Sequence, residues 1–233
     1  MATAWSDVIT SAMQVINDDR WQEQLDINPA QFYRAKSDTL AFALPLLNSP
    51  PELLTYLESD IVEPTYASGE WTSTAESVTE TSTAIDTGYI GYDLFSCVIR
   101  MGDGTEWLPY PAASYDAETG IVTFPQQPEA GIEYEYDFYT DGTLPTLSRS
   151  QMRLLALAVA VVWDEHFERN FLDITPKIHD TSFSAPNEPN YIEKSNRRLH
   201  DNRQSFNDEL HKYEQTCAYL NATRGGRTNY SLA

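Results

Sequence analysis

The sequence is short of basic residues. Lys and Arg number 15 against 35 Asp and Glu, which gives a formal net charge of −20. General nucleic-acid binding needs a positive surface that neutralises phosphates, so this composition argues against it. A negative charge of this size also repels anionic membranes and favours solubility. We therefore expect neither specific DNA binding nor a membrane partner.

Cysteine and long apolar runs are also scarce. Two thiols, Cys97 and Cys217, are too few for a disulfide framework or a cysteine zinc site, and both stand in apolar patterns typical of buried free thiols. The longest apolar run, residues 154–163, is too short to span a bilayer. The opening MATAWSDVIT has no basic region followed by an apolar one, so we expect no secretory signal and synthesis in the cytoplasm.

Catalytic signatures are missing as well. The sequence contains no G-x-S-x-G elbow, P-loop or G-x-G-x-x-G loop. WDEHFERNF gathers acids around His166, but adjacent Glu and His side chains point to different faces of a helix. Asp208 and His211 have metal-ligand spacing, yet a second Glu-x-x-His is absent. Solvated helix faces with local ion pairs, such as Glu165 with Arg169, explain these acids, so we expect no catalytic residue, metal or cofactor.

Helical patterning occupies both ends of the chain. In the N-terminal part, INPAQFY predicts a helix with Asn28 as its N-cap and Pro29 at its first position. In the C-terminal part, Ser148 is the expected N-cap of a central buried helix, and residues 173–187 are expected to form a loop. A last helix from about Glu188 to Leu220 carries a seven-residue repeat of Ile192, Leu199, Phe206, Tyr213 and Leu220, joined in its second half by Leu210 and Cys217. Its first half is polar almost all round, so it should pack against something outside the subunit.

The middle of the chain has the alternation of β-strands. DLFSCVIRM alternates apolar and polar residues, and Gly120 stands where a hairpin needs a left-handed residue. In EYEYDFY, the acids Glu133, Glu135 and Asp137 fall on one face of the strand and the aromatic residues on the other.

These patterns predict an α+β fold. N-terminal helices (1–62) and C-terminal helices (143–233, with a flexible tail at about 222–233) should form one bundle, into which an antiparallel β-sandwich or barrel (63–142) is inserted. Charge is unevenly shared, because residues 64–142 hold 14 acids and one base, whereas residues 143–233 hold 11 of each.

The acid row and the tail each leave alternatives open. The row is the polar face of a half-buried strand, or part of a ligand surface with Tyr134, Tyr136 and Tyr139, or a surface that repels an anion, and the concentration of charge adds weight to the last. The tail RGGRTNYSLA is either a plain flexible terminus or an arm that docks on a neighbour. In the second case its docking residues would be Arg224, Arg227, Tyr230 and Leu232.

Several stretches resemble known virion proteins. GDGTEW, the YDAETGIVTF hairpin and the following P-x-x-G are similar to a pattern in virion proteins of tailed bacteriophages. WSDVITSAMQVINDDRWQEQL, FYRAKSDTLAFALPLLNSPPELLTYL and the C-terminal helical pair resemble head-to-tail connector, or adaptor, proteins of the phage neck.

That resemblance implies a non-enzymatic structural protein of the virion neck. Such proteins form a ring, commonly of twelve subunits, below the portal protein, extend the DNA channel and dock a stopper or tail-completion protein. Glu133, Glu135 and Asp137 would then line a channel through which DNA passes without specific binding. Two other functions stay open: a baseplate or tail-tip structural protein, and a cytoplasmic ligand-binding module or enzyme.

Overall fold

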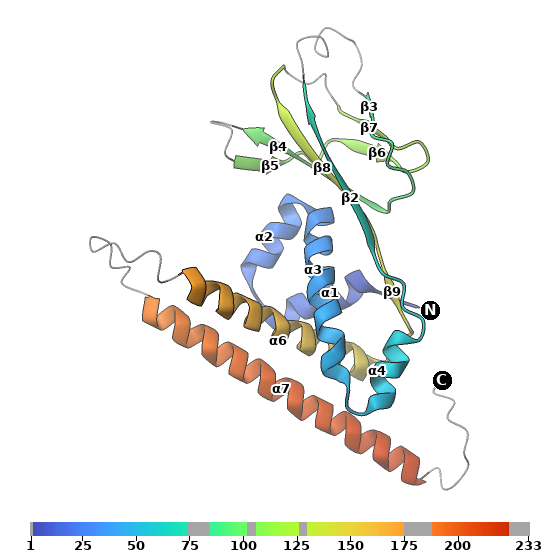
Figure 1. Ribbon diagram of the computed structural model, residues 1–233, viewed down its shortest axis with the longest axis vertical. Helices are drawn as coiled ribbons and strands as arrows, with labels where there is room; N and C mark the ends of the chain where they lie inside the picture. Colours follow the sequence, from blue (N-terminus) through green and yellow to red (C-terminus); the bar gives the residue numbers. More distant parts are fainter. Residues whose placement is uncertain (1, 74–83, 102–105, 126–129, 175–187, 224–233) are drawn as a thin grey trace. The chain divides into compact units, whose positions relative to one another are not determined.

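The computed structural model (Figure 1) describes residues 2–73, 84–101, 106–125, 130–174 and 188–223. The helices are α1 (Trp5–Ile16), α2 (Asp19–Ile27), α3 (Pro29–Ala43), the 3₁₀ helix η1 (Leu44–Leu47), α4 (Pro51–Glu58), α6 (Arg149–Ile174) and α7 (Glu188–Thr223). The strands are β1 (Thr3–Ala4), β2 (Thr65–Thr72), β3 (Ala84–Asp86), β4 (Leu94–Met101), β5 (Glu106–Pro109), β6 (Ser114–Asp116), β7 (Ile121–Thr123), β8 (Glu133–Thr140) and β9 (Thr143–Leu144).

The predicted α+β class is confirmed, with helices at both ends of the chain and antiparallel strands between them. The chain forms two compact units whose limits differ from the expected domains. Unit 1 comprises residues 1–38 and 60–144, and unit 2 comprises residues 39–59 and 145–233. The first N-terminal helices thus belong to the same unit as the strands, and the expected single bundle of N- and C-terminal helices stays a prediction.

Unit 1 contains three antiparallel sheets. Strands β2-β8-β4-β5 form the largest, β3-β7-β6 a second, and β1 pairs with β9. In the largest sheet Tyr136 of β8 lies between Gly69 of β2 and Cys97 of β4, which fixes the register of all three strands. The described strands do not close into a barrel.

An aromatic core joins the two larger sheets into a sandwich. Its fully buried members come from both sheets and the loop after β7: Cys97, Val122, Phe124, Tyr134, Tyr136 and Phe138. The Phe138 ring lies 4.9 Å from that of Tyr115, and the Phe124 ring lies 4.9 Å from that of Tyr134, in the tilted and edge arrangements that aromatic pairs prefer. Gly69 is required here, because a Cβ atom at its position would lie 2.4 Å from the Tyr136 ring. The sandwich, one of the two predicted forms, is therefore built around tyrosine and phenylalanine.

The predicted helix starts agree with the structure. Asn28 caps α3, since its side-chain oxygen accepts a hydrogen bond from the backbone N–H of Gln31 at 3.0 Å. Ser148 caps α6 with a reciprocal pair of hydrogen bonds to Gln151, a capping box. Gly120 has the expected positive φ of 75° in its hairpin.

Unit 2 is organised around α6. Its residues 154–162 are buried on every side, as the apolar run predicted. Helix α7 lies along α6 in antiparallel orientation (Figure 1), and η1 also contacts α6. On α7, Leu199 and Phe206 of the predicted seven-residue stripe are buried.

Candidate functional site

Strand β8 alternates as the sequence predicts. Tyr134, Tyr136 and Phe138 enter the aromatic core, and the acids of the same strand lie on the opposite face of the sheet. In an antiparallel sheet directly opposed residues share a face, so this outer face continues onto β2 and β4.

Asp137 is not part of an exposed acid row, contrary to the prediction. Its side chain is 3% exposed, and the Nδ2 of Asn28 donates to its Oδ2 at 2.6 Å. The strand pattern could not reveal this burial because the covering group, the start of α3, comes 109 residues earlier in the chain. Burial raises the pKa of Asp137, an effect that the Asn28 hydrogen bond and the Arg34 charge oppose.

Further bonds attach α3 to the same outer face. The backbone N–H of Ala30 donates to the Ser96 hydroxyl at 2.8 Å. Two turns further along α3, the Ser37 hydroxyl lies 3.0 Å from the Tyr139 hydroxyl. The Arg34 guanidinium stacks over the Tyr66 ring at 3.9 Å. Helix α3 therefore covers the end of the sheet where Asp137 lies.

The two remaining acids of the predicted row behave differently from each other. Glu133 is exposed and pairs with Arg100 at 3.1 Å, and the Arg100 guanidinium lies over the Trp107 ring. Glu135 is half-buried and stands directly opposite Glu70 of β2. Burial, followed by the nearby negative charges of Asp137 and Glu70, raises the pKa of Glu135. The accessible acids of this face are thus Glu70, Glu133 and Glu135.

A ligand surface built on Tyr134, Tyr136 and Tyr139 is not what unit 1 presents. The first two are core residues, and the Tyr139 ring stacks on that of Tyr33 with its hydroxyl bonded to Ser37 and Asp141. All three side chains are buried.

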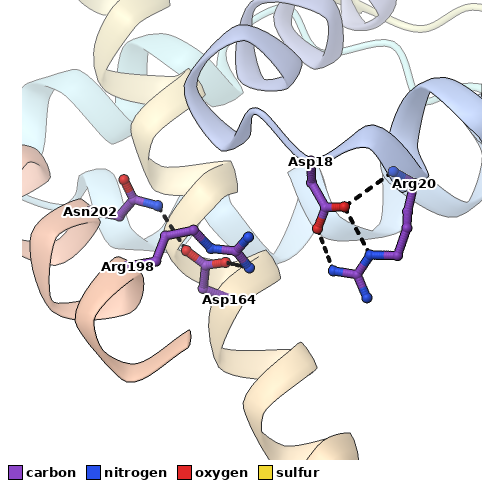
Figure 2. Close-up of polar contacts among 5 residues, drawn as sticks. All are labelled: Asp18, Arg20, Asp164, Arg198 and Asn202. Atoms are coloured by element: carbon purple, nitrogen blue, oxygen red, sulfur yellow. Dashed lines mark hydrogen bonds and ion pairs between the residues drawn. The ribbon is translucent and has the colours of Figure 1, made fainter. Parts of the chain in front are cut away.

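Lys36 is a buried cation that the sequence did not mark. It is 3% exposed, and its ammonium lies 4.7 Å from the centre of the Trp21 ring and 5.6 Å from that of Phe32. Burial lowers the pKa of Lys36 to about 8, although the carboxylate of Asp18 acts in the opposite direction. Asp18 also caps α2 and forms an ion pair with Arg20 (Figure 2).

A second buried charge lies between α6 and α7. Asp164 is fully buried, bonded by Arg198 at 2.5 Å and by Asn202 at 2.8 Å (Figure 2). The expectation of a solvated helix face is therefore wrong for this acid. The available signal was its spacing, since Asp164 follows the buried residues Leu157 and Ala160 by seven and four positions and so shares their face.

The polar contacts between α6 and α7 show how far along α7 the two helices lie side by side. Glu165 binds Arg203 at 2.7 Å, and near the start of α6 the Gln151 amide donates to the Tyr213 hydroxyl at 3.1 Å. In this antiparallel register the first residue of α6, Arg149, faces position 215, so residues 216–223 of α7 continue past α6. Eight residues of helix extend about 12 Å. We call this projecting segment, residues 216–223, the α7 overhang.

The α7 overhang has an apolar and uncharged surface. Tyr219 is 68% exposed and Leu220 is 43% exposed. Leu220 continues a stripe in which Leu199 and Phe206 are buried and Tyr213 is half-buried. Residues 215–223, QTCAYLNAT, contain no charged side chain.

Other predicted features can be placed only in part. The tail residues Arg224, Arg227, Tyr230 and Leu232 lie outside the described residues. The loop predicted at 173–187 starts later than expected, because α6 continues to Ile174, and residues 175–187 also lie outside the described residues. Cys97 is a buried free thiol as expected, and burial raises its pKa to about 12, whereas Cys217 is half-buried. Within the described ranges, no group of three or more His, Cys, Asp or Glu could hold a metal ion. None of the helices in those ranges is both long and apolar enough to cross a bilayer.

The chain matches no protein-family model, no curated protein and no solved structure.

Removing the Asn28 side chain should destabilise the chain. Asn28→Ala deletes an N-cap, which costs about 1 kcal/mol. It also leaves the buried Asp137 carboxylate without its donor, at a cost of about 1–3 kcal/mol. Urea unfolding should therefore show a loss of about 2–4 kcal/mol. Asp137→Asn, which keeps an acceptor and removes the buried charge, should be near neutral at pH 7, and so should Gln31→Ala. A value for Asn28→Ala that matches Gln31→Ala would contradict the assigned role of the bond.

Lys36 should make stability depend on pH above neutrality. Its pKa is about 8 in the folded chain against an ordinary value of 10.5, so between these pH values the unfolded chain holds a proton that the folded one does not. Raising the pH through this window should therefore stabilise the native protein relative to Lys36→Met, by about 2–3 kcal/mol in total. The measurement is the free energy of unfolding of both proteins from pH 7 to 10.5. The exposed Lys212→Met serves as control, and a pH-independent difference for Lys36→Met would contradict the lowered pKa.

Asp164→Ala should destabilise unit 2. The change leaves the Arg198 guanidinium between two helices without its carboxylate, and breaking a buried pair typically costs about 3–5 kcal/mol. Because Arg198 is partly exposed, we expect about 2–4 kcal/mol in urea unfolding. Glu165→Gln breaks the neighbouring, solvent-exposed pair with Arg203 and should cost less than about 1 kcal/mol. Equal effects of the two substitutions would show that burial of Asp164 has no energetic consequence.

Proposed function

We propose that this protein is a non-enzymatic structural component of a tailed-phage virion, a head-to-tail connector (adaptor) of the neck. The observation that carries the proposal is the α7 overhang, in which a 36-residue helix continues past its partner α6 and exposes Tyr219 and Leu220. A subunit that works alone gains nothing from such a surface, whereas an assembly subunit uses it.

The helix pair supports this proposal in a second way. Asp164 and its partners Arg198 and Asn202 hold α6 and α7 in a single register, so the overhang is presented by a fixed base. Preorganised surfaces lose less conformational entropy on binding than flexible ones. A ring subunit needs this property, because each contact must have the same geometry for the ring to close.

The charge distribution also agrees with a channel protein. Residues 64–142 carry 14 acids and one base, and the outer face of the largest sheet presents Glu70, Glu133 and Glu135. A surface of this kind repels phosphates and lets DNA pass without holding it. Asp137 has no part in this, because α3 covers it, and Arg100 offsets the charge of Glu133.

The partners follow from the proposed role. Copies of the chain form a ring, twelve in the proteins it resembles, below the portal protein and above a stopper or tail-completion protein. The tail, with Arg224, Arg227, Tyr230 and Leu232, supplies a basic segment that docks on one of these neighbours. The protein is made in the host cytoplasm and ends in the virion neck.

Immunogold electron microscopy of the source particles tests the proposal directly. With antibody against this chain, we expect gold at the junction of head and tail in intact particles. As a control, the same antibody absorbed with the purified chain should leave the particles unlabelled.

The other possible outcomes point to the alternatives. Gold at the far end of the tail would replace the connector by a baseplate or tail-tip protein. An absence of gold from all particles, with the epitope shown to be accessible, would remove the virion role and favour a cytoplasmic ligand-binding module.

A further inference from the structure

Unit 2 exposes large apolar side chains in two segments that contain no charged residue. The first is the α7 overhang, with Tyr219 and Leu220. The second, which we call the α3-end patch, consists of Phe42 on the last turn of α3 and Leu46 on the 3₁₀ helix that follows directly. Phe42 is 63% exposed, and no charged residue occurs between positions 39 and 51. The other large apolar side chains that the described residues expose belong to unit 1.

Phe42 and the overhang lie far apart on the helix pair, whereas Leu46 lies closer to the overhang, because Ser49, three residues further on, donates a hydrogen bond to Glu214 just before the overhang. The Phe42 ring contacts that of His166, with centroids 5.9 Å apart, late in α6. The overhang begins beyond Arg149, where α6 starts. Seventeen residues of α6 plus part of the overhang correspond to about 30 Å along the axis. One unit therefore carries two different apolar surfaces on the same helix pair, with Phe42 well separated from the overhang.

The overhang continues an existing interface. The stripe that α6 covers at Leu199 and Phe206 reaches Leu220 beyond Arg149, the first residue of α6. The surface that completes this seam must be apolar and free of charge, as α6 itself is over residues 154–162. The α3-end patch has that character.

Electrostatics favours the same pairing. Two copies of a chain with net charge −20 repel each other over most of their surfaces. Contact between copies is least opposed where neither segment contributes a charged side chain, and the overhang and the α3-end patch are two such segments. Two unlike patches that fit each other give a head-to-tail contact, which closes into a ring when the rotation between neighbours permits.

We propose that the α7 overhang of one copy docks on the α3-end patch of a second copy of this chain. The inference deepens the proposed function and takes its biological meaning from it, because it names the residues through which neighbouring subunits of the ring meet. Tyr219 and Leu220 are the anchors on one side, and Phe42 and Leu46 receive them on the other.

A complementation experiment tests the contact in the full-length chain. Tyr219→Glu/Leu220→Glu disables the overhang and leaves the α3-end patch intact, whereas Phe42→Glu does the reverse. Molecular mass is measured by analytical ultracentrifugation over a concentration series. The native chain should form species larger than a monomer as concentration rises, and each variant alone should stay monomeric. An equimolar mixture should form a one-to-one dimer, since one working surface of each kind remains.

The controls separate a lost contact from a lost fold. All substituted side chains are exposed, so circular dichroism and the thermal midpoint should match those of the native chain. Ile90→Glu, at an exposed apolar residue of unit 1, should associate like the native chain.

Three results would overturn the proposal: a native chain that stays monomeric throughout, either variant associating alone like the native chain, or a mixture that gives no dimer. In particular, normal association of Phe42→Glu would mean that two overhangs meet each other instead. Failure of the inference is distinguishable from failure of the proposed function. Gold at the neck with both variants incorporated normally removes only this contact, whereas successful complementation with gold elsewhere removes only the neck role.

Discussion

The architecture of unit 1 depends on one buried hydrogen bond, from Asn28 to the carboxylate of Asp137. The same residue ends α2 through its backbone N–H, which donates to the Gln24 carbonyl, and its side chain both caps α3 and fastens that helix to an interior strand of the sheet. The positive end of the helix dipole faces the carboxylate, which further favours this placement of a negative charge. With that point fixed, two side chains further along α3 contact the strands: the Ser37 hydroxyl bonds to that of Tyr139, and the Arg34 guanidinium stacks over the Tyr66 ring. Losing the bond would leave a buried charge without a donor, the costliest defect available there.

Both units contain buried charged side chains. Asp137 fixes a helix on a sheet, Lys36 lies over Trp21 and Phe32, and Asp164 links α6 to α7. Buried ion pairs seldom add net stability over apolar replacements, but they penalise every alternative register in which the partner is missing. In the proposed ring, where every copy must present the same surface, a unique register would be worth that cost. We interpret these three sites as devices that select one arrangement.

The distribution of charge then divides the molecule by task. The acids are concentrated in the strands, where Glu70, Glu133 and Glu135 keep the outer face of the sheet negative. The helical unit holds 13 acids and 11 bases, a net charge of only −2, and exposes apolar side chains at the end of α3 and on the α7 overhang. Long-range repulsion and short-range apolar contact thus come from different parts of the chain. In the proposed neck ring, the first would keep DNA moving and the second would hold neighbouring copies together.

The sequence by itself determined everything that depends on local chemistry. Asn28–Pro29 and Ser148 marked helix starts, Gly120 marked a hairpin, and the alternation in EYEYDFY separated the aromatic face of β8 from its acidic face, because caps, turns and strand periodicity are properties of neighbouring residues. Only the tertiary structure decided which acids are accessible. Asp137 and Asp164 look like solvated carboxylates in sequence, yet groups more than thirty residues away bury and bond them. Tertiary structure also decided the exposure of Leu220. The seven-residue stripe predicts that it is covered, but it is exposed because α6 begins at Arg149 and does not extend over it. Burial depends on the whole fold, and no local pattern encodes it.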